Sequence, residues 1–170
     1  YRYKIEKEEG SFMFKNIIFI TMSLILFSCA STQEATIKNI SGITHAGDKV
    51  HIPINKNEHT VVLFLSANCP CSNSHIPIIR NLSQKFKDIQ FVGVHSNYNE
   101  RKANTLRYFD RVDLAFPIIH DKESVIAKRL GALKTPHVFI INKKGVIVYN
   151  GSVTDASIAT SAKIQHLENA

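Results

Sequence analysis

Two cysteines separated by one proline stand where an apolar segment ends and an amphipathic segment begins. Residues 61–65 read Val-Val-Leu-Phe-Leu, a short run that is apolar on both faces and is typical of a buried strand in a mostly parallel sheet. After Cys69-Pro70-Cys71, apolar residues recur at three- and four-residue steps, as they do on one face of a helix. Pro70 suits the first position of such a helix. The sequence therefore predicts a strand that leads directly into a helix, with Cys69 at the junction.

A cysteine at the start of a helix is chemically different from a cysteine buried in a core. Unpaired backbone amides and the positive end of the helix dipole favour the thiolate, which is the nucleophilic form. We therefore interpret Cys69 as a nucleophile and Cys71 as its partner. Two structural cysteines or half of a zinc site are the alternatives, but no second Cys/His pair at ligand spacing completes a set of four ligands.

The N-terminal part of the chain has the pattern of an export signal. Residues 13–28 begin with Met13, continue with one positive charge and an apolar core, and end in a small residue. Cys29 follows at once, which resembles the lipobox of bacterial lipoproteins and implies a lipid-modified first residue. The apolar core is shorter than the roughly 20 residues that span a bilayer, which disfavours a transmembrane anchor. We expect a domain in the bacterial cell envelope, lipid-anchored to the membrane and facing the periplasm or the exterior.

The position of this export signal divides the chain into further segments. We interpret residues 1–12 as upstream translated sequence, residues 29–36 as a tether, and residues 37–170 as one domain with a truncated C-terminus. Lipidation of Cys29 leaves Cys69 and Cys71 as the free cysteines, in a compartment where disulfides persist. A disulfide between them closes almost no loop and gains little chain entropy, so a redox pair is the better interpretation.

Positive charge is spread along the chain rather than concentrated. The formal net charge is +7, but Lys and Arg alternate with Asp and Glu along the expected helices, as they do on solvated faces. A nucleic-acid site needs a basic stripe with aromatic residues beside it. We therefore expect no nucleic-acid partner.

Strands and helices alternate along the domain. Strands are expected over 36–40, 49–54, 89–95, 116–120, 137–141 and 146–149, in addition to the segment before Cys69. Helices are expected after Cys69 to about residue 87, from a polar cap at 97–100 to about residue 110, and over 122–130 and 155–170. This order predicts an α/β fold with a central mixed sheet and helices on both faces.

The order of elements resembles the thioredoxin fold. In particular it resembles the redoxin branch, which includes alkyl hydroperoxide reductase and thiol-specific antioxidant proteins and membrane-tethered thiol–disulfide oxidoreductases. The helix–strand–helix insertion between His95 and Gly131 is typical of that branch. Residues 131–145 match the family's Gly…Thr-Pro-x-x-Phe…Gly segment, in which the proline is cis and faces the cysteines. The resemblance therefore implies a cis Pro136 that, with Thr135, offers backbone to a bound substrate.

The same resemblance implies a membrane-tethered thiol–disulfide oxidoreductase. Its partners would be protein or small-molecule thiols and disulfides, and it would need no cofactor. The chain departs from the Cys-x-x-Cys pattern, because Ser72 occupies the place of the second cysteine and Cys71 lies one residue early.

Two other functions use the same residues. In a peroxiredoxin-like thiol peroxidase, Cys69 would be oxidised and Ser66 would hydrogen-bond the peroxide, although Val62 stands where that family has a proline. In a copper-binding or copper-delivery module, the ligands would be Cys69, Cys71, His75 and His137.

If the protein binds no copper, we interpret His75 as a solvated helix residue and His137 as a strand-edge residue. Surface or turn positions are expected for the remaining histidines, His45, His51, His59, His95, His120 and His166.

Overall fold

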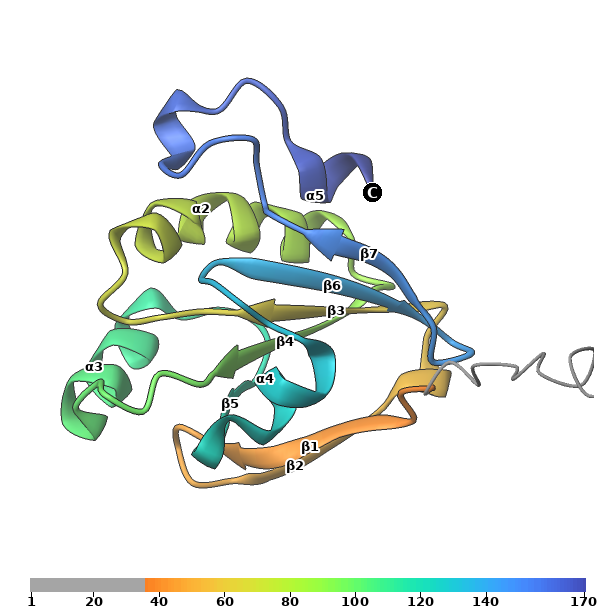
Figure 1. Cartoon of the computed structure of the whole chain (residues 1–170), viewed down its shortest axis with the longest axis horizontal. Coiled ribbons are helices and arrows are strands. Elements are labelled where there is room, and N and C mark those ends of the chain that lie inside the picture. The colour runs from red at the N-terminus through yellow and green to blue at the C-terminus, as the bar shows by residue number, and fades with distance from the viewer. Residues whose placement is uncertain (1–35) are drawn as a thin grey trace, which may run out of the picture. The chain divides into compact units, whose positions relative to one another are not determined.

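The computed structural model describes residues 36–170 (Figure 1). The expected signal, the lipid-attachment residue Cys29 and nearly all of the tether lie outside the described residues. Within residues 36–170, no helix combines the length and apolarity needed to cross a bilayer.

A seven-stranded sheet forms the centre of the domain, in the order β2-β1-β5-β4-β3-β6-β7. The strands are β1 Asn39–Thr44, β2 Lys49–Pro53, β3 His59–Phe64, β4 Gln90–His95, β5 Ile118–His120, β6 His137–Asn142 and β7 Ile147–Gly151. Strands β3, β4 and β5 are parallel to one another, and every other neighbouring pair is antiparallel. This arrangement confirms the predicted α/β fold with a mixed sheet.

Helices cover both faces of the sheet. The α-helices are α2 Pro70–Lys85, α3 Lys102–Val112, α4 Val125–Leu130 and α5 His166–Asn169, and the short 3-10 helices are η1 Ile54–Lys56, η2 Lys122–Ser124 and η3 Ala159–Ser161. Helices α2, α3 and α5 contribute to one apolar cluster, and α4 contributes to the cluster on the opposite face. In the view of Figure 1, α2 lies above β3 and β6, and α4 lies below these two strands, near β4 and β5. Elements α3, β5 and α4 form the expected helix–strand–helix insertion.

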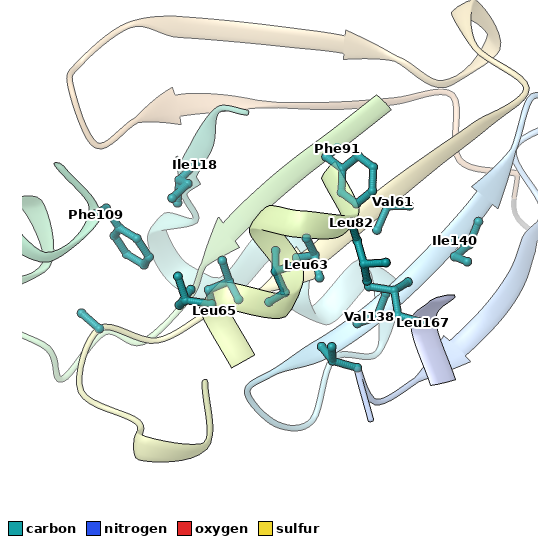
Figure 2. Packing of buried hydrophobic residues seen from close by; sticks show 14 residues of the cluster. Val61, Leu63, Leu65, Leu82, Phe91, Phe109, Ile118, Val138, Ile140 and Leu167 are labelled. Carbon is teal, nitrogen blue, oxygen red and sulfur yellow. The ribbon is translucent and has the colours of Figure 1, made fainter. Parts of the chain in front are cut away.

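Strand β3 is buried on both faces, as its apolar sequence predicts. Successive side chains of a strand point to opposite faces, so Val61 and Leu63 pack towards α2 while Val62 and Phe64 pack towards α4. Figure 2 shows the first of these layers, in which Leu82 of α2 lies close to the strand. Full burial of each such side chain contributes roughly 1.5–3 kcal/mol to folding.

Four strand ends meet at one edge of the sheet. The carboxyl ends of β3, β4 and β5 lie together because these strands are parallel, and β6 starts beside them, with His137 opposite Phe64. In open α/β sheets, ligands and reactive groups gather at this kind of edge. The loops that leave it carry Cys69, Glu100 and Asp121.

The prediction of a final helix over 155–170 is wrong. The chain after β7 is irregular apart from η3 and α5. The carboxylate of Asp155 accepts hydrogen bonds from the amides of Lys163 and Ile164, at 2.9 and 3.1 Å, which closes a loop instead of a helix. Leu167 is then buried in the core beside α2.

Two expected boundaries also differ from the structure. The first strand begins later than 36–40 and extends to Thr44, because its end pairs with β5. The helix expected over 122–130 is interrupted, since Glu123 and Ser124 have positive φ values of 62° and 55° and only α4 is α-helical. Asp121 still caps α4, because its carboxylate accepts hydrogen bonds from the amides of Ile126 and Ala127.

Candidate active site

The two cysteines lie at the first turn of α2. Cys69 is the N-cap residue in an extended conformation, and α2 begins at Pro70 as predicted. Both side chains are half-buried and carry free thiols. The Cys71 thiol hydrogen-bonds the sulfur of Cys69, so the two residues form a close pair.

The surroundings of Cys69 favour its thiolate. Burial raises the pKa of this thiol, but hydrogen bonds from the backbone of Ser72, the side chain of Thr135, and the backbone and side chain of Cys71 outweigh that effect and lower the pKa below its ordinary value. Two of these donors are amides of the first helical turn, which have no partner within a helix. The helix start therefore stabilises a negative charge on the sulfur, as the sequence predicts.

The Thr135–Pro136 segment faces the cysteines. The peptide bond between these residues is cis, as the resemblance implies. The Cys69 thiol donates a hydrogen bond to the Thr135 carbonyl at 3.4 Å. This segment reaches α2 because it precedes β6, which is paired with β3.

Two hollows flank this segment. One, of about 360 Å³, is lined by Cys71, Pro136, Ser152 and Thr154, among others. The second, of about 510 Å³, lies on the other side of Thr135 and is lined in part by Phe64, Asn97 and Leu133. The first hollow borders the cysteine pair at Cys71, so a substrate chain can approach the pair from that side.

Ser66 lies beneath the cysteine pair and is buried. Its hydroxyl accepts a hydrogen bond from the Cys69 amide at 3.0 Å and donates one to the carboxylate of Glu100. The hydroxyl hydrogen is thus already used within the protein, and a peroxide contact at Ser66 would have to displace Glu100.

The interpretations of His75 and His137 as solvated or edge residues are wrong. Both are buried, with 1% and 5% of their surface exposed. His75 hydrogen-bonds the Cys71 carbonyl through Nδ1 at 2.7 Å and the Thr154 hydroxyl through Nε2 at 2.8 Å. The segment after β7 covers His75, and this packing of distant segments cannot be read from the local helical pattern.

His137 is enclosed because β7 lies outside β6. Its Nδ1 accepts a hydrogen bond from the Leu133 amide at 3.2 Å, and its Nε2 donates to the Asn150 side chain at 2.7 Å. Burial lowers the pKa of His137; the bond to Asn150 opposes this effect and the charge of Lys134 adds to it.

The proposed copper ligands do not fit a metal site. Every ring nitrogen of His75 and His137 is held by a hydrogen bond within the protein. Across residues 36–170, no three or more His, Cys, Asp or Glu side chains are grouped so that they could hold a metal ion.

Two residues of the site were not recognised in the sequence. His95 was expected at the surface, but it is 2% exposed at the end of β4. Its Nε2 contacts the carboxylate of Glu100 at 3.2 Å, and the Glu100 side chain is 5% exposed. One feature of the sequence could have identified Glu100: it is an acidic residue shortly after a buried parallel strand, β4. At that edge of the sheet its carboxylate can contact the loop that follows the neighbouring strand β3.

The fold and the cysteine pair together define a class of protein, the thioredoxin-like proteins with two cysteines at a helix start opposite a cis proline. The family model described as Redoxin matches residues 33–165. The chain belongs to the redoxin family.

Two relatives and one solved structure show how the chain compares with known proteins. The thiol-disulfide oxidoreductase ResA of Halalkalibacterium halodurans is 25% identical over 114 residues, which cover 66% of this chain and 65% of the relative. The thioredoxin-like protein YneN of Bacillus subtilis is 27% identical over 115 residues, 65% of this chain and 67% of that protein. The chain thus spans about two thirds of the length of these relatives.

The solved structure confirms the fold. A secreted disulfide oxidoreductase of Mycobacterium tuberculosis, described as homologous to DsbE of E. coli, superimposes with a TM-score of 0.59 at 17% identity. The superposition covers 76% of this chain and 90% of that structure.

Proposed function

We propose that this protein is a thiol–disulfide oxidoreductase in which Cys69 attacks and Cys71 resolves. The observation that carries the proposal is the position of Cys69 at the N-cap of α2, where two backbone amides and the Cys71 thiol donate hydrogen bonds to its sulfur. This arrangement holds a thiolate within reach of solvent and places a second thiol beside it. ResA is a thiol-disulfide oxidoreductase and the M. tuberculosis protein is described as a disulfide oxidoreductase, which supports this proposal.

The reaction would proceed in two exchanges. The Cys69 thiolate attacks one sulfur of a substrate disulfide, a new S–S bond forms as the substrate bond breaks, and the departing thiolate takes a proton from water. The Cys71 thiolate then attacks the Cys69 sulfur and releases the second substrate thiol. The substrate gains two electrons and two protons, and the protein retains a Cys69–Cys71 disulfide. The reverse sequence would oxidise a dithiol.

The remaining residues of the site would orient the substrate. In this proposal the backbone of Thr135 and Pro136 contacts the chain on either side of the substrate disulfide. Ser66 supports the turn before Cys69 instead of binding substrate, since its hydroxyl is already shared between Cys69 and Glu100.

We also propose that the protein is exported and held at the membrane by a lipid on Cys29. The pattern over residues 13–29 supports this proposal, and the M. tuberculosis neighbour is described as secreted. The partners would then be thiols and disulfides of the cell envelope.

Trapping of the mixed disulfide tests the proposed reaction. In a chain that carries Cys29→Ser throughout, a Cys71→Ser variant offered a peptide disulfide is expected to accumulate a covalent peptide adduct at Cys69, measured by intact-mass spectrometry. A Cys69→Ser variant is the matched control and should form no adduct. Equal adducts in both variants, or none in either, would refute the assignment of Cys69 as nucleophile.

A further inference from the structure

A buried carboxylate, Glu100, lies behind the turn that carries Cys69. Its two oxygens receive four hydrogen bonds, from the Ser66 hydroxyl, the Ala67 amide at 3.0 Å, the Asn97 side chain at 2.9 Å and Nε2 of His95 at 3.2 Å. A carboxylate can accept hydrogen bonds at both oxygens at once, which the amide of glutamine cannot do. Neither the fold nor the exchange reaction described above requires a buried carboxyl group at this position.

Two of these hydrogen bonds reach the cysteine turn directly. Because the Ser66 hydrogen points to Glu100, a lone pair of the same oxygen is available to the Cys69 amide at 3.0 Å. Glu100 also holds the Ala67 amide, so it fixes the turn at two points. The Ser66 amide in turn donates to the buried hydroxyl of Ser72 at 3.0 Å, which joins the turn to α2.

The groups around the carboxylate come from three further elements. His95 of β4 presents Nε2 to it, and His120 of β5 stacks on His95 with an Nδ1–Nδ1 distance of 3.5 Å. Burial lowers the pKa of His95; the nearby Glu100 opposes that effect and the charge of His120 adds to it. On α3, burial raises the pKa of Tyr108, and the nearby charge of Glu100 adds to this effect while Arg111 opposes it.

We propose that Glu100 is a positioning residue for Cys69. Through Ser66 and Ala67 it holds the turn in the one geometry that directs the sulfur at the amides of the first turn of α2. The inference deepens the proposed function, because it concerns the residue assigned there as the nucleophile. It leads to a specific expectation for the thiol, namely that loss of the carboxylate makes Cys69 less acidic.

The direction of this change distinguishes positioning from a direct charge effect. Removal of a nearby negative charge, taken alone, makes a thiolate easier to form and lowers the thiol pKa. Glutamine has one acceptor oxygen and a donating amide, so Glu100→Gln either loses the bond from the Ala67 amide or reverses the bond with Ser66, whose hydroxyl then accepts instead of donating. If positioning dominates, the Cys69 sulfur moves away from its amide donors and its pKa rises despite the lost charge.

The test measures the rate of iodoacetamide alkylation of Cys69 against pH, in the full chain carrying Cys29→Ser and Cys71→Ser so that Cys69 is its one cysteine. With Glu100→Gln, the midpoint of the profile is expected to move up by about one pH unit, which slows alkylation about tenfold at neutral pH. Asp121→Asn is the matched control, because Asp121 is also a buried carboxylate with three hydrogen bonds but none to the cysteine turn. It should leave the midpoint unchanged even if it lowers stability.

A second variant covers the case in which Glu100→Gln fails to fold. Ser66→Ala keeps the charge of Glu100 and removes only the connection to Cys69, so it should raise the midpoint in the same direction. Where both variants fold, their combined shift should be smaller than the sum of the two, because they break one connection. An unchanged or lowered midpoint in Glu100→Gln, or an equal shift in Asp121→Asn, would overturn the proposal. Because alkylation needs no substrate disulfide, these outcomes are independent of whether the proposed exchange reaction takes place.

Discussion

The amide of Ser66 donates a hydrogen bond to the hydroxyl of Ser72 at 3.0 Å, across the turn that carries Cys69. Ser72 has no exposed surface and stands three residues after Cys69. The place of the second cysteine of a Cys-x-x-Cys motif is thus occupied by a residue that connects the end of β3 to the start of α2. The second cysteine of the close pair, Cys71, lies one residue earlier.

This contact leads to a prediction for Ser72→Ala. The substitution leaves the buried Ser66 amide without an acceptor, and the free energy of unfolding should fall by about 1–3 kcal/mol. Urea denaturation measures the change. Ser83→Ala in the same helix is the control, because the Ser83 hydroxyl only donates to the Arg80 carbonyl one turn back. A Ser72→Ala protein as stable as the Ser83→Ala protein would contradict the bridging role.

A second prediction concerns the attachment of the C-terminal segment to α2. Thr154→Val removes the hydroxyl that His75 contacts at 2.8 Å, and it leaves a buried ring nitrogen without a partner. The unfolding free energy should decrease by about 1–3 kcal/mol. Thr160→Val, at an exposed position of the same segment, should stay within about 0.5 kcal/mol of the parent protein. Equal denaturation midpoints for the two variants would refute the contact.

A third prediction is a loss of stability in acid that depends on His137. The pKa of this buried ring is lower in the folded protein than its ordinary value of 6.5. The unfolded chain therefore binds the proton more readily, so the stabilisation is complete above the unfolded pKa and is lost as the pH falls through the folded pKa. The slope of unfolding free energy against pH below 6.5 should be smaller in His137→Gln than in the parent protein. His51→Gln, at an exposed position, should keep the parent slope. A slope unchanged by His137→Gln would contradict this origin of the acid sensitivity.

Much of the fold was predictable because the relevant signals are local. The apolar run of β3 and the change of period after Cys69 identify the strand–helix junction, and the alternation of elements gives the mixed sheet. The Thr135–Pro136 segment was predicted from its likeness to a family motif, and the structure confirms both its cis bond and its place opposite Cys69.

Several wrong predictions concern contacts between segments distant in sequence, whereas the break at Glu123 and Ser124 in the helix expected over 122–130 is local. His75 has the local pattern of a solvated residue, yet its partner Thr154 lies 79 residues away. Glu100 follows a polar loop, and its burial depends on β4 lying beside β3. The segment after Asp155 has helix-forming residues, but the Asp155 carboxylate and the burial of Leu167 favour a loop.

A redox titration tests the central claim most directly. The full chain carrying Cys29→Ser, so that only Cys69 and Cys71 remain, would be equilibrated in glutathione buffers of graded ratio, and its free thiols and intact mass would be measured at each step. The account predicts one reversible two-electron transition from two thiols to a Cys69–Cys71 disulfide. A Cys71→Ser variant should instead form only a mixed disulfide with glutathione at Cys69. If the parent protein keeps both thiols free at every ratio, or collects only glutathione adducts, the two cysteines are not a redox pair.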